Sequence, residues 1–473
     1  MLRKLLSHAT IYGLSAQVPR LVGVLTLPVI TQFLTSADYG VAGVVTAYAS
    51  AFNMVHTLGL SVVMVNAYAK QPKRFHWIWR QLHGFISLWS IVYGLLMVLF
   101  LYHVVPAEAD EDRLQIALLY SLPTMLFTAT EMQANFFHQL SQRPLTLALR
   151  SFVAAGVGVG LNIYTIAYLK MGYMGWFYSY FTSLAIGFSF NFYSVYVKEG
   201  LWPIFNFKWY RIRKSLKVSL PVVPHHMAGF LLDTSDRLVL SIMGVSIRNI
   251  GLYNVASSFG SYFQIASYAI SQAASPFYLR LFAQEEGIEA ALDARKLTFS
   301  LHVIFLFVST LICLWMREIF ILLIRNEELR QAYPLAIVIL MGYNYKPMYS
   351  AVTNYLTYRE HTGKLWRISV VAGVANVLLN FILVPIYGFE AAAFTTFAAL
   401  MFMGYAGFFM KEFRQTSLVS YYPLAWMAVT IGLLIGVYNL VESAVDTKAL
   451  ITALIGILTL VVVYRQRMLL FKK

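Results

Sequence analysis

Long apolar runs that recur along the whole chain constrain this sequence more than any other feature. About fourteen stretches of ~20 mostly apolar residues alternate with short breaks that are charged or contain Gly and Pro. They lie near residues 9–34, 40–66, 84–105, 114–138, 146–168, 174–197, 216–243, 250–275, 298–324, 331–357, 365–385, 390–410, 421–441 and 449–465. Because each run is long enough to cross a bilayer as a helix, the sequence predicts an all-α polytopic membrane protein with about 14 transmembrane helices.

Composition supports a membrane location and limits the chemistry. Hydrophobic residues make up 59% of the 473 residues and charged residues only 12%, whereas soluble domains carry about 25% charged residues. The single cysteine, Cys313, excludes a disulfide framework and a cysteine-based metal site. The sequence contains no zinc motif, Walker motif, Rossmann fingerprint or nucleophile elbow. It therefore predicts no metal, no resident cofactor and no use of ATP, and it favours a transporter over an enzyme.

The basic residues alternate between the two sides of the predicted helices. Most of the 36 Lys and Arg residues fall in every second loop, in segments such as KQPKRFHWIWR, KEGLWPIFNFKWYRIRKSLK and the tail RQRMLLFKK, whereas PAEADEDR is acidic. By the positive-inside rule, this pattern places both termini in the cytoplasm and implies an even number of spans. The net charge of +15 thus reflects topology, and it favours contact with anionic lipid head groups rather than nucleic acid.

Two sequence matches indicate an internal duplication. SADYGVAGVVTAYASAF resembles SIRNIGLYNVASSFGSYF, with Gly40 aligned to Gly251, and LNIYTIAYLKMGYMGWFYSYF resembles LNFILVPIYGFEAAAFTTF, with Gly172 aligned to Gly388. Both pairs have nearly the same separation, and an even number of spans in each copy gives the copies one orientation, which predicts a pseudo-two-fold axis along the membrane normal. We expect a six-helix lobe at 1–197, a basic cytoplasmic linker at 198–215, a second six-helix lobe at 216–410 and two added transmembrane helices, 13 and 14, at 411–473.

Six of the charged residues inside the apolar runs are the first functional candidates. They are Arg20, Glu131, Asp233, Asp236, Arg237 and Lys346. A charge at mid-membrane costs from about 2.5 to over ~10 kcal/mol, so such side chains normally face a water-filled cavity or each other. We expect Arg20, Arg237 and Lys346 to line a cavity. Asp233 and Arg237 are also spaced to pair along one helix, and mutual neutralisation of these two is the alternative.

Polar side chains on several runs repeat at helical spacing. The candidates for a binding surface are Asn53, Asn135, Ser257, Ser261, Gln264, Tyr343 and Ser350. The same spacing also suits helix packing, because small hydroxyl residues are common between membrane helices. Pro221 and Pro224, in the segment LPVVPHH, predict a kink that acts as a bending gate, and a static kink is the alternative.

Several longer segments together resemble a known family. They are PRLVGVLTLPVITQFLTSADYG, SLPVVP followed by DRLVLSIMGVSIRNIGLYNVA, and NVLLNFILVPIYGFEAAAFTT. With them, the chain resembles the polysaccharide transporter family of the multidrug, oligosaccharidyl-lipid and polysaccharide exporter (MOP) superfamily, in particular the Wzx-type O-antigen flippases. The resemblance covers nearly the whole chain, and it implies a MATE-like fold in a bacterial inner membrane.

The resemblance also implies a function. Such a protein carries undecaprenyl-diphosphate-linked oligosaccharide from the cytoplasmic to the periplasmic leaflet by alternating access, with a proton or sodium gradient as a candidate energy source and polysaccharide-assembly proteins as candidate partners. Arg20, Asp236 and Arg237 lie in the matching segments. We expect the three bases to hold the diphosphate or acidic sugars and the polar faces to contact the glycan. Glu131, Asp233 and Asp236 are the candidates for exchanging the coupling ion.

Other interpretations remain open at the level of the sequence. A MATE-like multidrug exporter of the same superfamily would bind organic cations in an acidic, aromatic cavity. A lipid II flippase would differ only in its cargo. A membrane glycosyltransferase or O-antigen polymerase belongs to another class, but such enzymes usually carry a large periplasmic loop, and the predicted outer loops here are short.

Overall fold

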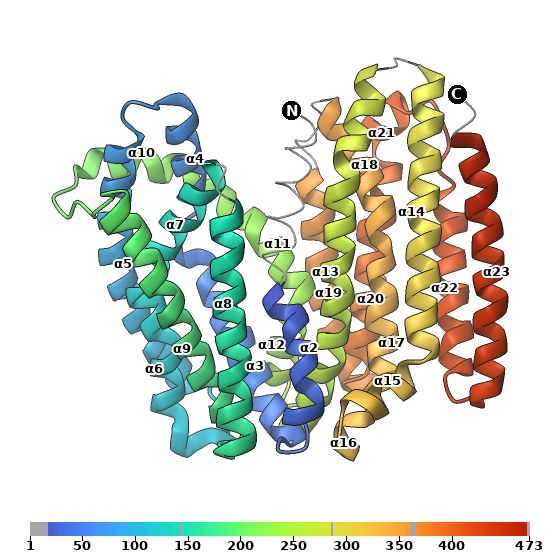
Figure 1. Cartoon of the computed structure of the whole chain (residues 1–473), viewed down its shortest axis with the longest axis horizontal. Coiled ribbons are helices and arrows are strands. Elements are labelled where there is room, and N and C mark those ends of the chain that lie inside the picture. The colour runs from blue at the N-terminus through green and yellow to red at the C-terminus, as the bar shows by residue number, and fades with distance from the viewer. Residues whose placement is uncertain (1–17, 142–143, 285–286, 360, 362–364, 471–473) are drawn as a thin grey trace. The chain divides into compact units, whose positions relative to one another are not determined.

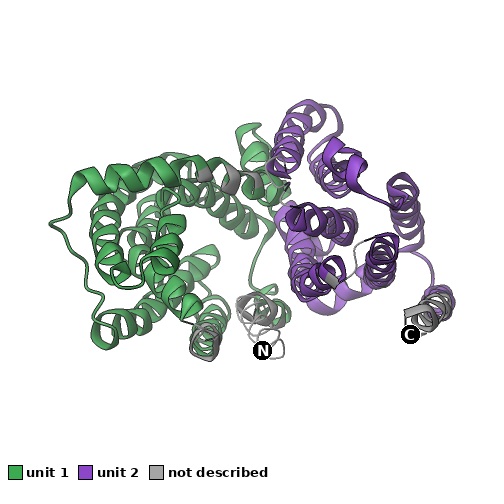
Figure 2. Cartoon of the chain, turned by 90° about the horizontal axis from the view of Figure 1, so that it is seen from above, with its two compact units in different colours: residues 1–251 green, residues 252–473 purple. Residues whose placement is uncertain are grey.

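The protein is all-helical wherever the structure describes it, which confirms the predicted fold class. The computed structural model describes residues 18–141, 144–284, 287–359, 361 and 365–470. Within these ranges it contains helices and no strand. The chain divides into two compact units, residues 1–251 (unit 1) and 252–473 (unit 2), shown in different colours in Figure 2. The predicted boundaries of the lobes and linker stay predictions.

Unit 1 is a bundle of helices that run up and down along its length (Figure 1). Its helices are α2 (Val18–Ile30), α3 (Ser36–His56), α4 (Ser61–Lys70), α5 (Phe75–Val104), η1 (Ala107–Asp112), α6 (Arg113–Leu126), α7 (Thr128–Leu140), α8 (Pro144–Asn162), η2 (Ile163–Tyr168), α9 (Tyr173–Phe192), η3 (Tyr193–Lys198), α10 (Trp209–Ser219), η4 (Leu220–Val222), α11 (Val223–Asp233) and α12 (Ser235–Ile242). The long helix α13 (Ile247–Gln284) begins in unit 1 and continues into unit 2.

Unit 2 is a second helical bundle. After α13 it contains α14 (Ile288–Leu314), α15 (Met316–Leu323), α16 (Glu327–Arg330), α17 (Tyr333–Gly342), η5 (Tyr343–Tyr345), α18 (Lys346–Tyr358), α19 (Leu365–Tyr387), α20 (Ala391–Tyr405), η7 (Ala406–Phe409), α21 (Lys411–Thr416), α22 (Pro423–Leu440) and α23 (Val445–Leu470).

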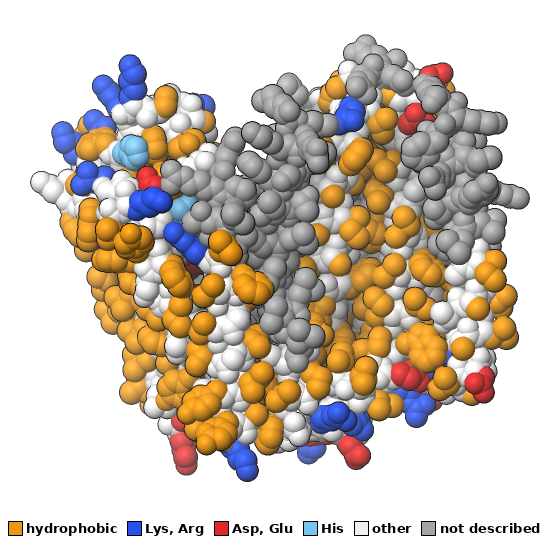
Figure 3. Space-filling model, in the orientation of Figure 1, with side chains coloured by type: hydrophobic (Ala, Val, Ile, Leu, Met, Phe, Trp, Pro, Cys, Tyr) orange, Lys and Arg blue, Asp and Glu red, His pale blue; other side chains and the backbone are white. Residues whose placement is uncertain are grey.

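Length and apolar composition explain why these segments form helices. In the described part of the chain, six stretches are long and apolar enough to cross a membrane: Ser36–Lys70, Phe75–Val104, Ile288–Leu314, Leu365–Tyr387, Ala391–Phe409 and Pro423–Leu440. Several other predicted runs are divided between two helices that meet end to end, such as α6 and α7 at Phe127. Apolar side chains cover the visible flanks, while charged side chains gather at the ends (Figure 3).

The run at 216–243 differs from the single kinked helix expected there. Pro221 lies in the short turn η4, Pro224 in the first turn of α11, and the helix breaks again at Thr234 before α12 begins. Proline supplies no backbone N–H, so a regular helix cannot pass through this segment unchanged. The kink thus coincides with the two prolines, and its role as a gate stays a prediction.

The first pair of aligned glycines marks a reciprocal contact between α3 and the start of α13. A Cβ atom on Gly40 would lie 2.0 Å from the carbonyl oxygen of Ile247, and one on Gly251 would lie 1.8 Å from that of Ser36. In the alignment of the two copies, Ser36 corresponds to Ile247. Gly40 thus contacts Ile247, and the aligned Gly251 contacts the aligned Ser36. The contact is the same in both directions, as it would be across a two-fold axis.

The second pair of aligned glycines shares a backbone conformation. Gly172 has a φ of 56° and Gly388 a φ of 83°, a region that favours glycine. Gly172 lies directly before α9, and Gly388 lies in the short turn between α19, which ends at Tyr387, and α20, which begins at Ala391. Both aligned glycines thus supply a positive φ in a turn that precedes a helix, and the duplication itself stays a prediction.

The segment between η3 and α10 lies against α5. The backbone N–H of Ile204 donates to the carbonyl of Arg80 at 2.9 Å, and Nε of Arg80 donates to the carbonyl of Trp202 at 2.7 Å. A Cβ atom on Gly84 would lie 2.1 Å from the Ile204 carbonyl oxygen, so only glycine permits this close approach. We call residues 199–208 the strap.

Basic side chains crowd the end of unit 1 at which the strap lies. Exposed bases there include Lys70, Lys73, Arg74, Lys198, Arg211, Arg213, Lys214 and Lys217. At the opposite end, η1 carries the acidic residues Glu108, Asp110, Glu111 and Asp112. We call the first of these the basic end; it is the upper left region of Figure 3.

Candidate functional site

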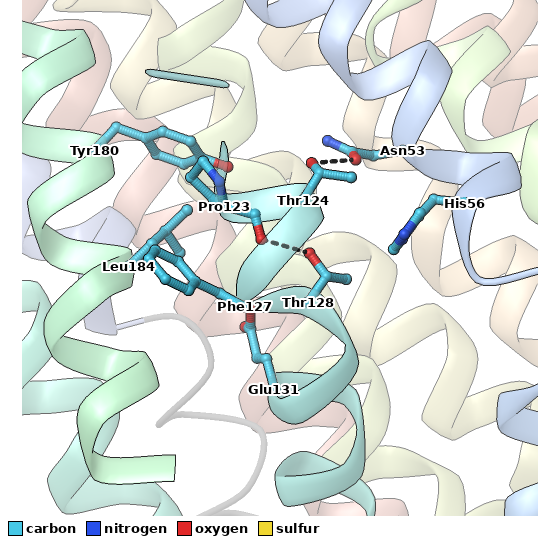
Figure 4. Close-up of a pocket in the computed structure, with 9 residues that line it drawn as sticks. All are labelled: Asn53, His56, Pro123, Thr124, Phe127, Thr128, Glu131, Tyr180 and Leu184. Carbon is cyan, nitrogen blue, oxygen red and sulfur yellow. Dashed lines mark hydrogen bonds between the residues drawn. The ribbon is translucent and has the colours of Figure 1, made fainter. Parts of the chain in front are cut away.

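A polar cavity lies inside unit 1, between α3, α6, α7 and α9 (Figure 4). Its volume is about 240 Å³. The polar side chains that line it are Asn53, His56, Thr124, Thr128, Glu131 and Tyr180, and Pro123, Phe127 and Leu184 supply the apolar part of the wall. Two residues singled out from the sequence, Asn53 and Glu131, are thus brought to one cavity.

The break between α6 and α7 shapes the cavity. Pro123 lies near the end of α6, and the helix is interrupted at Phe127. The hydroxyl of Thr128 donates to the Pro123 carbonyl at 3.3 Å, and that of Thr124 donates to Oδ1 of Asn53 on α3 at 3.1 Å. These bonds hold the polar groups on the cavity side of the break.

Glu131, His56 and Tyr180 are the titratable residues that line this cavity. Glu131 is partly buried, and its carboxylate is hydrogen-bonded by Asn135 on the next turn of α7. The His56 side chain is only 1% exposed, and its Nε2 lies 2.8 Å from the hydroxyl of Ser90. Its Nδ1 has no hydrogen-bond partner among the described residues. The arrangement can hold a proton or a small cation, because hydroxyl, amide and carboxylate oxygens converge there.

Lys346 lies in unit 2, at the junction of η5 and α18. Its side chain is 8% exposed, and Nζ lies 3.6 Å from the centre of the Tyr268 ring on α13. The rings of Tyr349 and Tyr345 lie 5.5 and 5.9 Å away. Cation–π contact of this kind stabilises a buried ammonium group.

The charged turn in helix α12 belongs to unit 1. Nη1 of Arg237, which is partly buried, donates to the backbone carbonyl of Asp233 at 3.3 Å. The Asp233 side chain is exposed, whereas Asp236 is only 3% exposed and lies in the first turn of α12, where the helix dipole favours an anion. The side chain of Arg20, in α2, lies outside the described residues.

The remaining polar candidates lie on several helices and do not converge within one described cavity. In unit 2, the hydroxyls of Ser257 and Ser261 donate to carbonyls of their own helix, α13, at 3.1 and 2.9 Å. Gln264 and Ser350 are buried on α13 and α18, and Tyr343 is buried in η5. In unit 1, Asn135 is exposed, as are Pro221 and Pro224. Whether these residues contact a ligand stays a prediction.

Two buried polar networks in unit 1 were not singled out from the sequence. In one, the Tyr196 hydroxyl lies 2.8 Å from Nε2 of His83 and 2.6 Å from the Thr130 hydroxyl, and Nδ1 of His83 contacts Oε1 of Gln133. In the other, Arg150 contacts His138. Histidine and arginine within apolar runs were the only signal in the sequence that could have found them.

The family is established by a family model and the fold by solved structures. The model described as "Polysaccharide biosynthesis protein" matches residues 5–282, more than half of the chain. A structure of the lipid II flippase MurJ in an inward closed conformation is 14% identical, with a TM-score of 0.63, and covers 93% of this chain and 99% of its own. A comparison with curated protein sequences gave no match.

Multidrug transporters share the same fold. An inward-facing MATE family transporter of the MOP superfamily matches with a TM-score of 0.53 and 14% identity, over 93% of this chain and 96% of its own. The Vibrio cholerae MATE transporter VcmN in the bent form matches with a TM-score of 0.51 and 13% identity, over 92% and 98%. The chain is therefore a multi-pass membrane protein with the fold of the MOP superfamily, and it belongs to the polysaccharide biosynthesis protein family.

Proposed function

We propose that this protein is a flippase of the bacterial inner membrane that moves an undecaprenyl-diphosphate-linked oligosaccharide, such as an O-antigen repeat unit, from the cytoplasmic to the periplasmic leaflet. The observation that carries the proposal is the family match combined with a fold that a lipid II flippase shares over nearly its whole length. In this proposal both termini lie in the cytoplasm, because the positive-inside rule places the basic loops of the sequence there.

The chemistry of the cargo suits the buried bases. A lipid diphosphate is anionic, and guanidinium and ammonium groups are its natural partners in a site of low dielectric constant. In this proposal Arg20, Arg237 and Lys346 hold the diphosphate or acidic sugars during transport. The hydroxyl and amide groups of Asn53, Asn135, Ser257, Ser261, Gln264, Tyr343 and Ser350 contact the glycan, and Pro221 and Pro224 allow a bend during alternating access.

Ion coupling is assigned to the acidic residues. Glu131 is the strongest candidate, because its carboxylate lines a cavity together with hydroxyl and amide groups. Asp233 and Asp236 are further candidates on either side of the break at Thr234. A proton or sodium ion that binds one of these acids as the transporter changes conformation would couple transport to the ion gradient.

The sidedness of the cargo tests the flippase function. Cells with and without the gene are treated with an impermeant sugar-modifying reagent that reaches only the periplasmic leaflet. We expect the lipid-linked oligosaccharide to accumulate in a form inaccessible to the reagent when the gene is absent. Equal labelling in both strains would refute the proposal.

Substitution of the bases tests their assignment. Arg237→Ala and Lys346→Ala should abolish transport while leaving the amount of folded protein in the membrane unchanged, because each removes a cation for the diphosphate. Arg213→Ala, on the exposed surface of α10, is the matched control. Full transport by both of the first two variants would remove these residues from the site.

A multidrug exporter is the second candidate, and the cavity in unit 1 is the observation that favours it. A carboxylate, Glu131, lies there with two aromatic rings, Phe127 and Tyr180, which is a suitable environment for an organic cation. Expression of the protein would then lower the accumulation of fluorescent organic cations in cells. An unchanged accumulation would leave the flippase as the sole proposal.

A further inference from the structure

Arg150 is a basic residue that the proposed transport site does not use. It lies on α8, roughly two turns from the start of that helix, and its side chain is partly buried. Nη1 lies 2.7 Å from Nε2 of His138 on α7 and 3.4 Å from Oδ1 of Asn191 on α9. The Ser194 hydroxyl of η3 also lies 3.0 Å from the same His138 nitrogen. Three neighbouring helical segments thus position one guanidinium group.

The hydrogen bonds leave this cluster with a net positive charge. A guanidinium group only donates hydrogen bonds, so Nε2 of His138 must accept, and the imidazole is neutral. Asn191 and Ser194 are neutral as well. His138 and Asn191 therefore orient Arg150 without supplying the negative charge that a partly buried cation requires.

In the part of the chain that the structure describes, no acidic side chain pairs with Arg150. The sequence contains neither Asp nor Glu between Glu131 and Glu199. Among the residues that the structure describes, no ion pair includes Arg150.

The free edge of the guanidinium remains open to a ligand. Nε and Nη2 of Arg150 make no hydrogen bond to any residue that the structure describes. These donors form a planar fork, the geometry that binds a phosphate group through paired hydrogen bonds. The missing counter-charge is therefore best supplied by an anion with oxygen acceptors.

The surroundings indicate that this anion is part of a lipid. Large apolar side chains are exposed along α8, α9 and η3, among them Phe152 at 60%, Tyr193 at 63% and Val197 at 60%. Exposed apolar side chains on a membrane helix suit acyl or prenyl chains. A cation at the end of such a surface suits the phosphate at the head of the same molecule.

We propose that Arg150, oriented by His138 and Asn191, binds the phosphate of a lipid head group at the basic end of unit 1. The phosphate can come from an anionic phospholipid of the bilayer or from the diphosphate of a polyprenyl carrier. The second source rests on the proposed flippase function. The first does not.

Binding of defined lipids to the purified full-length protein tests the proposal. The ligands are a short-chain phosphatidylglycerol and a short-chain polyprenyl diphosphate, with phosphatidylcholine as the neutral control, and the dissociation constant of each is measured in detergent. Arg150→Gln should weaken binding of the anionic lipid by roughly tenfold or more, because a charge-assisted bidentate contact is lost. Arg150→Lys should retain part of the affinity, and the matched control Arg213→Gln, on α10, should retain all of it.

The outcomes separate the two sources. Binding of polyprenyl diphosphate alone assigns the site to the carrier, and binding of phosphatidylglycerol alone assigns it to the bilayer. Equal affinity of the parent protein and Arg150→Gln for both lipids would overturn the proposal. If the sidedness test fails while Arg150-dependent lipid binding persists, the flippase function is refuted and the lipid site remains.

A measurement on the unsubstituted protein covers the case in which Arg150→Gln does not fold. A phosphatidylglycerol or polyprenyl diphosphate with a photoreactive group near its phosphate is cross-linked to the parent protein, and the adducts are mapped by mass spectrometry. We expect adducts on α7, α8, α9 and η3. Adducts confined to other helices would contradict the assignment.

Discussion

Glu131 carries the charge on which the proposed coupling depends. Its carboxylate lines the cavity of unit 1 and is hydrogen-bonded by Asn135. The hydroxyls of Thr124 and Thr128 lie on the same wall of the cavity. An ion bound to this carboxylate can leave only when water or another cation reaches the site. Ion exchange at Glu131 should therefore depend on the opening of the cavity.

Replacing this carboxylate should uncouple transport from the ion gradient. Glu131→Gln keeps the shape and the hydrogen-bonding capacity of the side chain but cannot change its charge. We expect transport by this variant in proteoliposomes to become independent of an imposed proton or sodium gradient. The matched control is Glu289→Gln, an exposed residue of α14, which should behave like the parent protein. If transport by Glu131→Gln still depends on the gradient as it does in the parent protein, another acidic residue must bind the coupling ion.

The sequence predicts charged candidates better than it predicts their partners. Glu131 and Lys346 stand out because a charge inside an apolar run is costly and visible. Thr124 and Tyr180, which complete the cavity, do not stand out, because hydroxyl residues are equally common where membrane helices pack. Arg150 was missed because it lies near a helix end, where a base is expected in any cytoplasmic loop.

At the scale of whole elements, the strap is the feature that the sequence did not predict. The assignment of residues 198–215 to a linker stays a prediction, but the sequence did not indicate that the strap is hydrogen-bonded to α5 or that α10 buries Ile212 in the core of unit 1. The close approach depends on Gly84, a single glycine at the start of the predicted run 84–105. Hydropathy gives the length of a helix, but it does not reveal which of its faces receives another segment.

A methyl group at Gly84 should therefore displace the strap. Gly84→Ala places a Cβ atom 2.1 Å from the Ile204 carbonyl oxygen, and we expect it to lower the free energy of unfolding by about 1–3 kcal/mol. Gly187→Ala, in α9, has no atom within 4 Å of the new Cβ and should be neutral or stabilising by up to ~1 kcal/mol. Thermal unfolding of the purified variants measures both. Equal midpoints of thermal unfolding for the two variants would show that the strap can move away from α5 without a loss of stability.

Helix α23 is joined to the rest of unit 2 by a buried ion pair. The Lys448 side chain is 0% exposed, and Nζ lies 2.7 and 2.9 Å from the carboxylate oxygens of Glu318 on α15. Glu318 is partly exposed, so removal of the lysine leaves a carboxylate that water can still reach. The pair fixes the start of α23 in register with α15.

Removing this lysine should destabilise unit 2. We expect Lys448→Met to lower the free energy of unfolding by roughly 1–3 kcal/mol, less than the 3–5 kcal/mol of a fully buried pair. Lys296→Met breaks a pair with Asp293 in which both side chains are about one-third exposed, and it should cost less than about 1 kcal/mol. The unfolding midpoints of the two variants, measured in the same detergent, compare the two losses of stability. A larger loss for Lys296→Met would contradict the assignment.

At the scale of the whole molecule, the apolar runs predict the fold well because membrane insertion depends mainly on length and hydropathy. The all-helical architecture and the MOP fold are confirmed. The breaks at Phe127 and Thr234 are not visible in hydropathy, because a break inside the membrane changes the hydrogen bonds of the backbone and not its composition. The lobe boundaries stay predictions.

The predicted topology can be measured with single cysteines. Cys313 is fully buried, so Cys313→Ala gives a suitable background. We expect Asp110→Cys, in η1, to react with an impermeant maleimide from the periplasm, and Arg213→Cys, in α10, to react only after the inner membrane is permeabilised. Reaction of both positions from the same side would refute the topology.

The reciprocal contact between α3 and the start of α13 has a consequence for the origin of the chain. Gly40 meets Ile247 and Gly251 meets Ser36, and these four residues occupy matching places in the two copies. In a dimer of identical subunits, an isologous interface repeats each contact in just this way. A duplication of a six-helix unit, which stays a prediction, would explain this symmetry, because the crossing would then descend from an interface between two identical ancestors.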